Sequence, residues 1–146
     1  MMSGDCALCV LDAAEALWAN DQCFVISADV TGVGTICRVI WRAHIREMSD
    51  LDAAARGAFM DIVWGVEAVL RTLTRPAKMN VASLGNQVPH LHWHVIPRYR
   101  DDAYFPETIW APAHRDALTR PLQDTVLRAA LEAGLGNQAK SPSIMA

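Results

Sequence analysis

The chain has 146 residues, 52% of them hydrophobic and 20% charged, with a formal net charge of −3. This length and composition predict a single compact domain that buries about two-thirds of its unfolded surface. The negative net charge argues against an extended nucleic-acid surface but not against a nucleotide in a pocket, and no apolar run is long enough to span a membrane.

The N-terminal segment carries a Cys-x-x-Cys motif, Cys6 and Cys9, and no basic region followed by an apolar stretch. Without such a signal peptide we expect a cytoplasmic location, where cysteines serve as thiols or metal ligands rather than disulfides. A single motif of this kind is compatible with a redox pair, two metal ligands or chance. The following residues do not predict the βαβ setting of a redox pair, and zinc needs two further ligands.

Hydrophobic periodicity predicts the remaining elements. They are a short helix at 11–18, a hairpin of strands 24–30 and 35–41, a long amphipathic helix at 49–73, a strand at 79–84, and a helix at 121–135. Ser49 is the predicted N-cap of the long helix, and Trp64 is predicted to lie in the core. Strands and helices do not alternate regularly, which predicts an α+β domain with an antiparallel sheet over residues 1–136 and a disordered tail at 137–146.

Histidine recurs at every second position of the stretch His90-Leu91-His92-Trp93-His94-Val95-Ile96. A period of two predicts a strand with all three imidazoles on one face and the intervening apolar residues in the core. The outer two histidines would lie about 13 Å apart at Cα, so all three cannot share one metal. Two should serve one centre and the outer one another. An imidazole pair can supply a nucleophile and a proton donor to a phosphorus centre.

Two segments after the triad can be interpreted as structural rather than functional. The charged run at 98–102 is typical of a solvated face. The aromatic, proline-containing segment at 104–110 is unsuited to a helix; it could line a base pocket, of its own subunit or of a partner subunit, or pack over the sheet. His114 is predicted to be a surface residue.

The order His-apolar-His-apolar-His-apolar-apolar resembles the motif of the histidine triad (HIT) family of nucleotide hydrolases and transferases. The stretch KMNVASLGNQVPHLHWHVIPR (78–98) resembles the bacterial short-chain branch described as diadenosine polyphosphate hydrolase-like, as do the segments at 6–9 and 39–44. The resemblance covers about residues 5–112. It implies the HIT fold, with about five antiparallel strands, a long central helix and a C-terminal helix, and it implies a homodimer.

The resemblance also implies a reaction, covalent nucleotidyl transfer. His92 attacks the α-phosphorus of a dinucleoside polyphosphate or nucleoside phosphoramidate, His94 donates a proton, and water releases the monophosphate. A backbone carbonyl is expected to hold the other nitrogen of His92, and no catalytic cofactor is required. The alternatives are a nucleotidyltransferase or phosphorylase using the same histidine, and a nucleotide-binding regulatory protein with negligible turnover.

Substrate-binding residues are implied at the loop Gly85, Asn86, Gln87 and Val88, which holds the phosphate in the family. Many relatives read Gly-Gln-Ser/Thr-Val here, so this chain keeps an amide at Asn86 but lacks the following hydroxyl. Asn80 is a further candidate, with a hydrogen-bonded edge-strand amide as the equal alternative.

A structural zinc site is implied as well. Relatives that carry the Cys-x-x-Cys motif bind zinc through residues matching Cys6, Cys9, His44 and His90. This set is consistent with the outer triad histidine serving a separate centre. The alternative is two ordinary thiols.

Overall fold

The computed structural model describes residues 3–136, and the predicted tail at 137–146 lies outside them. The elements in chain order are β1 (Trp18–Ala19), β2 (Cys23–Val30), β3 (Gly34–Trp41), α1 (Ala53–Thr74), β4 (Lys78–Ala82), β5 (His92–Arg98) and α2 (Asp124–Leu135), with short 3-10 helices at Ser3–Asp5, Ala13–Glu15 and Met48–Asp50. The strands form one sheet in the order β1-β2-β3-β5-β4, and every neighbouring pair is antiparallel. The predicted α+β architecture is confirmed. No helix in the described range could cross a membrane.

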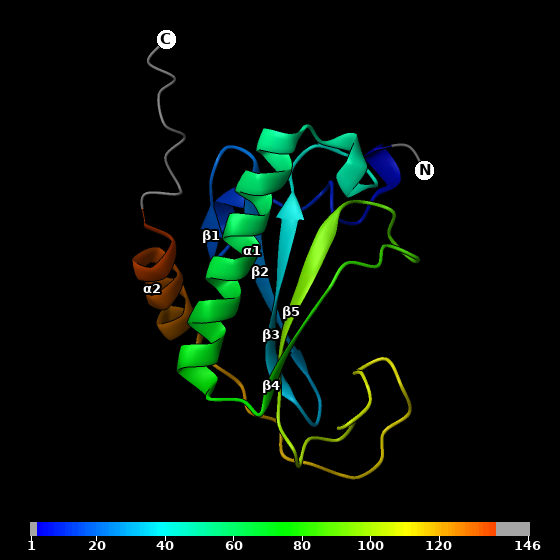
Figure 1. Cartoon of the computed structure of the whole chain (residues 1–146), viewed down its shortest axis with the longest axis vertical. Coiled ribbons are helices and arrows are strands. Elements are labelled where there is room, and N and C mark those ends of the chain that lie inside the picture. Colours follow the sequence, from blue (N-terminus) through cyan, green and yellow to red (C-terminus); the bar gives the residue numbers. More distant parts are fainter. Residues whose placement is uncertain (1–2, 137–146) are drawn as a thin grey trace.

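One face of the sheet is covered by α1, and α2 lies beside α1 (Figure 1). The apolar stripe of α1 meets the alternate residues of the central strands, and α2 adds three leucines to the same core. The buried members include Val25, Val39 and Val95 from the sheet, Phe59, Ile62, Val63, Val66 and Leu70 from α1, and Leu127, Leu131 and Leu135 from α2. The opposite face is covered in part by the N-terminal segment, which packs on Phe24 and Ile40, and it carries the site.

The predicted helix at 11–18 is wrong. The segment makes only a 3-10 turn at Ala13–Glu15 and then enters the sheet as β1. The backbone N–H of Leu17 donates to the carbonyl of Val25 on β2. Pairing with a neighbouring strand therefore overrides a helical spacing that is only two turns long.

The long helix begins later than predicted. Asp52, not Ser49, is its N-cap, and the Asp52 Oδ1 accepts a hydrogen bond from the backbone N–H of Ala55 at 2.8 Å. Ser49 lies in the preceding 3-10 turn. Trp64 is not in the core: it is 50% exposed, so the apolar stripe of α1 does not include it.

The triad strand has the predicted alternation with shifted ends. β5 begins at His92 and continues through Pro97, which pairs with Met79 of β4. His90 lies just before the strand. Leu91 and Val95 are buried in the helix-side core, and Trp93 packs against it. The histidines therefore project from the other face, as the period of two predicts.

The charged run at 98–102 is solvated only in part: Arg100 and Asp101 are exposed, whereas Arg98 and Asp102 are not. Arg98 and Asp102 are fully buried and form an ion pair, with the Arg98 Nε 2.8 Å from the Asp102 Oδ2. The carboxylate also accepts hydrogen bonds from the backbone N–H groups of Tyr99, Tyr104 and Phe105. Burial alone would raise the pKa of Asp102, but the hydrogen bonds from Arg98 and from the three backbone N–H groups lower it to about 2. The pair thus anchors the segment that follows β5.

That segment returns to the sheet at its far end. The backbone of Arg120 exchanges hydrogen bonds with Val33 and Thr35 beside the hairpin turn. The close approach requires glycine at position 34, because a Cβ there would overlap the carbonyl oxygen of Arg120 and φ is +136°. Residues 99–119 are therefore held at both ends near the triad side of the sheet.

Candidate active site and metal cluster

The side of the sheet opposite α1, here called the triad face, is defined by β5 and its register partners on β3. Arg38 pairs with His94, and Ile40 pairs with His92. Directly opposed residues in an antiparallel pair project from the same face. The triad face therefore presents two imidazoles beside a guanidinium and an isoleucine.

His92 is held in one tautomer. Its Nδ1 lies 2.6 Å from the carbonyl oxygen of His90. A carbonyl can only accept, so Nδ1 carries the proton and donates, and Nε2 keeps its lone pair. The sequence predicts a backbone carbonyl partner; the structure identifies it as that of the first triad histidine. A ring nitrogen with an available lone pair is the form of histidine that can act as a nucleophile.

His94 lies against His92, with ring centroids 5.0 Å apart and planes at 73°. On its other side the Trp110 ring lies 5.1 Å away at 76°. Burial, followed by the charges of His92 and Arg38, lowers the pKa of His94 to about 4, so the ring is neutral near pH 7. It can then donate a hydrogen bond from one nitrogen but is not an imidazolium acid before substrate binds. Its Nδ1 is buried with no hydrogen-bond partner.

The predicted phosphate loop joins β4 to His90, so it ends next to the triad. Asn86 and Gln87 are exposed, and Gly85 has φ +80°, a conformation that favours glycine. Asn80 lies on the triad face of β4, and its side-chain oxygen accepts a hydrogen bond from the Arg98 Nη1 at 2.8 Å. That contact favours the structural role for Asn80, and the binding roles of the loop residues stay predictions.

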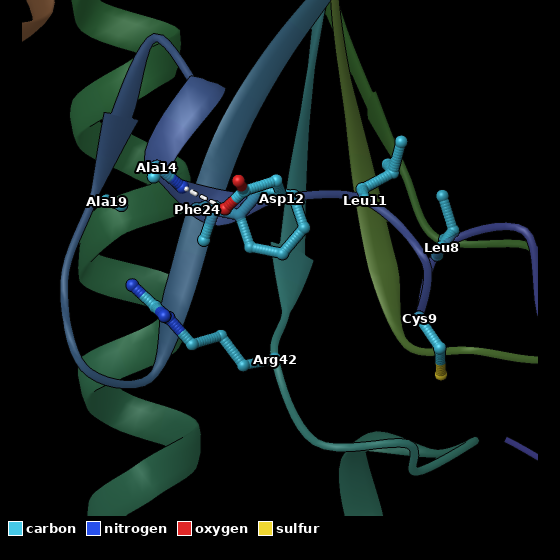
Figure 2. Close-up of a pocket in the computed structure, with 9 residues that line it drawn as sticks. Leu8, Cys9, Leu11, Asp12, Ala14, Ala19, Phe24 and Arg42 are labelled. Carbon is cyan, nitrogen blue, oxygen red and sulfur yellow. Dashed lines mark hydrogen bonds between the residues drawn. The ribbon is translucent and has the colours of Figure 1, made fainter. Parts of the chain in front are cut away.

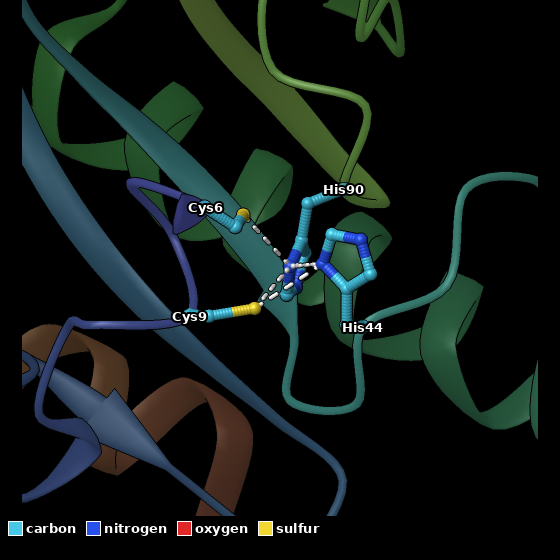
Figure 3. Close-up of side chains that lie close together, drawn as sticks. All are labelled: Cys6, Cys9, His44 and His90. Atoms are coloured by element: carbon cyan, nitrogen blue, oxygen red, sulfur yellow. Dashed lines mark hydrogen bonds between the residues drawn. The ribbon is translucent and has the colours of Figure 1, made fainter. Parts of the chain in front are cut away.

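A cluster of two cysteines and two histidines lies at the start of β5 (Figure 3). One ligand atom from each of Cys6, Cys9, His44 and His90 lies within 4.8 Å of the others. The Nδ1 of His90 is 3.5 Å from the Cys6 Sγ, 3.4 Å from the Cys9 Sγ and 3.3 Å from the Nδ1 of His44, and the Cys9 Sγ is 3.2 Å from the same His44 nitrogen.

This spacing fits a shared cation. Tetrahedral bonds of about 2.0–2.3 Å place nitrogen and sulfur ligands about 3.3–3.8 Å apart. One lone pair on the His90 Nδ1 cannot accept from three neighbours at once. The His90 Nε2 donates to the carbonyl of Trp41 at 2.6 Å, which leaves Nδ1 unprotonated, as ligation requires. The four side chains can therefore hold one metal ion together.

A hollow of about 500 Å³ lies next to the cluster but not at the triad (Figure 2). It is lined by Leu8, Cys9, Leu11, Asp12, Ala13, Ala14, Ala19, Phe24 and Arg42. Phe24 pairs with Ile40, which pairs with His92, so the hollow begins two strands, about 10 Å, from that histidine. We therefore do not assign the reaction centre to it.

Residues 12–101 match the family model of the HIT domain. The chain belongs to the HIT family. HIT proteins bind nucleotides, and the match includes the triad and His44, whereas Cys6, Cys9 and Trp110 lie outside it. A comparison with curated proteins gave no match.

Solved structures of HIT proteins share the fold. A histidine triad protein from Bradyrhizobium japonicum is 25% identical, with a TM-score of 0.66 over 82% of this chain and 88% of that one. A hypothetical histidine triad nucleotide-binding protein from Sulfolobus tokodaii is 14% identical, with a TM-score of 0.64 over 92% and 97%. A Zn-bound histidine triad family protein from Mycobacterium smegmatis is 18% identical, with a TM-score of 0.61 over 90% and 96%. The latter two show the fold alone.

Two residues near the triad are missing from the predicted site. Trp110 lies in the segment for which a base pocket was one interpretation, but its contact with His94 depends on how residues 99–119 fold back. Arg38 does have a sequence signal: it is the one charged residue inside the otherwise apolar run Ile36–Trp41. A lone cation in such a run needs a partner or a function.

Proposed function

We propose that the protein is a nucleotide hydrolase that cleaves nucleoside 5′-phosphoryl compounds through a covalent nucleotidyl-His92 intermediate. The observation that carries the proposal is the 2.6 Å contact of the His92 Nδ1 with the His90 carbonyl, which leaves the opposite nitrogen as a lone pair on the triad face. The family to which the chain belongs supports a nucleotide as the ligand.

In the first step the His92 Nε2 forms a bond to the α-phosphorus, and the bond from phosphorus to the leaving group breaks with its electron pair on the leaving group. In the second step water attacks the same phosphorus, the nitrogen–phosphorus bond breaks, and a nucleoside monophosphate leaves with neutral His92 restored. The carbonyl of His90 stabilises the positive ring that exists between the two steps. Water supplies the oxygen and the protons, so no catalytic cofactor is required.

His94 acts in this scheme as a hydrogen-bond donor. A neutral ring can donate to a nonbridging or leaving-group oxygen, and the negative charge of a bound phosphate favours a proton on that ring. Backbone N–H groups of the Gly85–Val88 loop and the Asn86 amide are the further donors we assign to the phosphate oxygens. Preformed donors stabilise charge that develops on those oxygens.

We assign structural zinc to Cys6, Cys9, His44 and His90. The ligand spacing, the orientation of His90 and the Zn-bound relative from Mycobacterium smegmatis support the assignment. Bound there, the ion supplies a crosslink between the N-terminal segment, the segment after β3 and the start of β5. His90 then contributes its ring to the metal and its carbonyl to His92, so the crosslink also positions the nucleophile.

We propose a homodimer in the cytoplasm. The half-exposed Trp64 on α1 and the unpaired edge of β4 support a second copy on that side of the molecule. Sedimentation velocity of the wild-type chain and of Trp64→Ala tests this directly: a wild-type monomer at micromolar concentration would refute it.

The test of the proposed function compares His92→Ala with His114→Ala. His114 is an exposed histidine outside the triad strand and serves as the matched control. Each protein is given a dinucleoside polyphosphate or a nucleoside phosphoramidate, and monophosphate release is measured. The covalent intermediate is sought by a rapid alkaline quench and intact mass. His92→Ala should lose at least about four orders of magnitude in turnover and the mass adduct, and the control should lose neither.

Three other outcomes identify the alternatives. Monophosphate formed only when a phosphorylated acceptor is present, and captured on that acceptor, indicates a transferase or phosphorylase. Nucleotide binding by wild type with no turnover of any substrate indicates a regulatory binder. A well-folded His92→Ala variant with near wild-type turnover refutes the nucleophile assignment.

A further inference from the structure

Arg38 is a cation on the triad face, and among the described residues 3–136 it has no hydrogen-bond or ion-pair partner. It lies in the middle of β3, opposite His94 on one side and Ile26 on the other. Its Nε is buried without a hydrogen-bond partner. Among residues 3–136 the ion pairs are those of Arg98 with Asp102 and Arg120 with Asp101, and neither involves Arg38.

Within the described part of the chain, Arg38 lacks a hydrogen-bond acceptor although its neighbours on β3 are apolar. The same-face neighbours of Arg38 along β3 are Ile36 and Ile40, both fully buried. A guanidinium stays charged at physiological pH, and a buried donor without an acceptor is costly. By contrast, Arg98, which is fully buried, donates hydrogen bonds to Asp102 and Asn80. Arg98 therefore has internal acceptors, whereas Arg38, beside the triad, has none among residues 3–136.

A second buried nitrogen without a hydrogen-bond partner lies on the residue directly opposite Arg38. The His94 Nδ1 is also buried with no partner, and Arg38 and His94 are register partners. Their register pairing puts the two side chains on the same face of the sheet, and after burial and His92 the charge of Arg38 also lowers the pKa of His94. Arg38 is only partly buried, so an anionic oxygen can accept from its other guanidinium nitrogens and from the second ring nitrogen of His94.

The position of this pair separates it from the predicted phosphate loop. The loop precedes His90 and reaches the triad from the β4 side, whereas Arg38 lies on β3, across β5 from β4. Arg38 lies on the strand next to His92 and two residues along it, so the two Cα atoms are about 8 Å apart. A phosphoryl group attacked by His92 can be held by the loop, and an anion held by Arg38 would be a different group.

We propose that Arg38, together with His94, binds a second phosphate of the substrate, on the leaving-group side of the phosphorus that His92 attacks. The substrate class is then nucleoside or dinucleoside polyphosphates rather than nucleoside phosphoramidates, whose leaving group is an uncharged amine. This assignment rests on the proposed function. The substrate supplies the acceptor that the protein itself leaves out, so Arg38 is a specificity-determining residue of the triad site.

The experiment uses the full chain with Arg38→Gln, Arg38→Lys and Arg38→Met. The control is Arg71→Gln, which removes an exposed arginine on α1, across the sheet from the triad. Turnover of a dinucleoside polyphosphate and of a nucleoside phosphoramidate is compared. For the polyphosphate, Arg38→Gln should lower kcat/KM by about ten- to hundredfold, mostly through KM, with Arg38→Lys intermediate. The phosphoramidate should change by less than about threefold, and the control should change neither.

A stability measurement separates this role from a structural one. Arg38→Met places an apolar chain of similar length among isoleucines, so it should melt no lower than wild type although it binds polyphosphate poorly. A structural arginine would give the reverse, a lower melting temperature in every Arg38 variant. Equal loss of kcat/KM for both substrates would also overturn the proposal, since Arg38 would then act on the shared α-phosphoryl group.

Binding without turnover keeps the inference independent of the catalytic scheme. Inorganic pyrophosphate is titrated calorimetrically into His92→Ala and into the double variant with Arg38→Gln. Weaker binding by about tenfold or more in the double variant supports Arg38 as an anion ligand even if the wild-type chain hydrolyses nothing, an outcome that refutes the proposed function alone. Unchanged pyrophosphate affinity overturns the Arg38 assignment whatever the turnover results are.

Discussion

Replacing Asp102 by asparagine removes the charge from a fully buried ion pair while keeping the size of the side chain. In the wild type its two oxygens accept from the Arg98 Nε and Nη2 at 2.8 and 3.0 Å and from three backbone N–H groups. Asparagine has only one side-chain oxygen, and its NH2 group would face some of the N–H donors that the second carboxylate oxygen accepts from in the wild type. The variant thus leaves Arg98, whose side chain is 2% exposed, as an uncompensated buried cation.

The expected cost follows from that burial. Breaking a buried pair by removing one partner costs about 3–5 kcal/mol, a large part of a typical total of about 5–15 kcal/mol. The adjacent substitution Asp101→Asn is the matched control. Asp101 pairs with Arg120 on the surface, where the side chains are 74% and 41% exposed, so its loss should cost less than about 1 kcal/mol.

Urea unfolding of the two variants measures both costs, and limited proteolysis reports on the segment that Asp102 anchors. Asp102→Asn should unfold at much lower urea and should be cleaved faster within 103–112, because the backbone bonds that hold this segment beside His94 are weakened. If Asp102→Asn costs no more than Asp101→Asn, the buried network does not stabilise the fold as argued.

Other perturbations test the division of roles and the backbone. His90→Ala should lower the melting temperature and abolish zinc binding, whereas His94→Ala should leave both nearly unchanged and slow turnover by about a hundredfold or more. Thermal melts, elemental analysis and turnover rates measure these effects, and an equal loss of stability in the two variants would contradict the division of roles. Burial lowers the pKa of His94 from 6.5 to about 4, so the unfolded chain binds this proton first as pH falls; the free energy of unfolding should decline between about pH 6.5 and 4 more steeply in wild type than in His94→Asn. Gly34→Ala should destabilise by more than about 1 kcal/mol through overlap with the carbonyl of Arg120, while Gly57→Ala, in open space on α1, should stabilise by up to about 1 kcal/mol; denaturant midpoints test both signs.

Local periodicity predicts most of the fold. The hairpin, the long helix and the triad strand are confirmed within a few residues, because their patterns extend over two or more repeats of the period. The helix predicted at 11–18 and the N-cap at Ser49 are wrong, because in each the local pattern competes with a better long-range or neighbouring partner, the β2 strand in one and Asp52 in the other.

By itself the sequence determines which side chains share a face of β5, since alternate residues of any strand project to the same side. It also determines the chemistry available there: three imidazoles, two early thiols and a phosphate-loop candidate. The tertiary structure decides which of these groups meet. The Cys6 Sγ contacts the His90 ring across 84 positions, and Arg98 and Asp102 are buried rather than solvated. Only the strand order and register place Arg38 opposite His94, because pairing between distant strands is set by packing of the whole sheet and not by any local pattern.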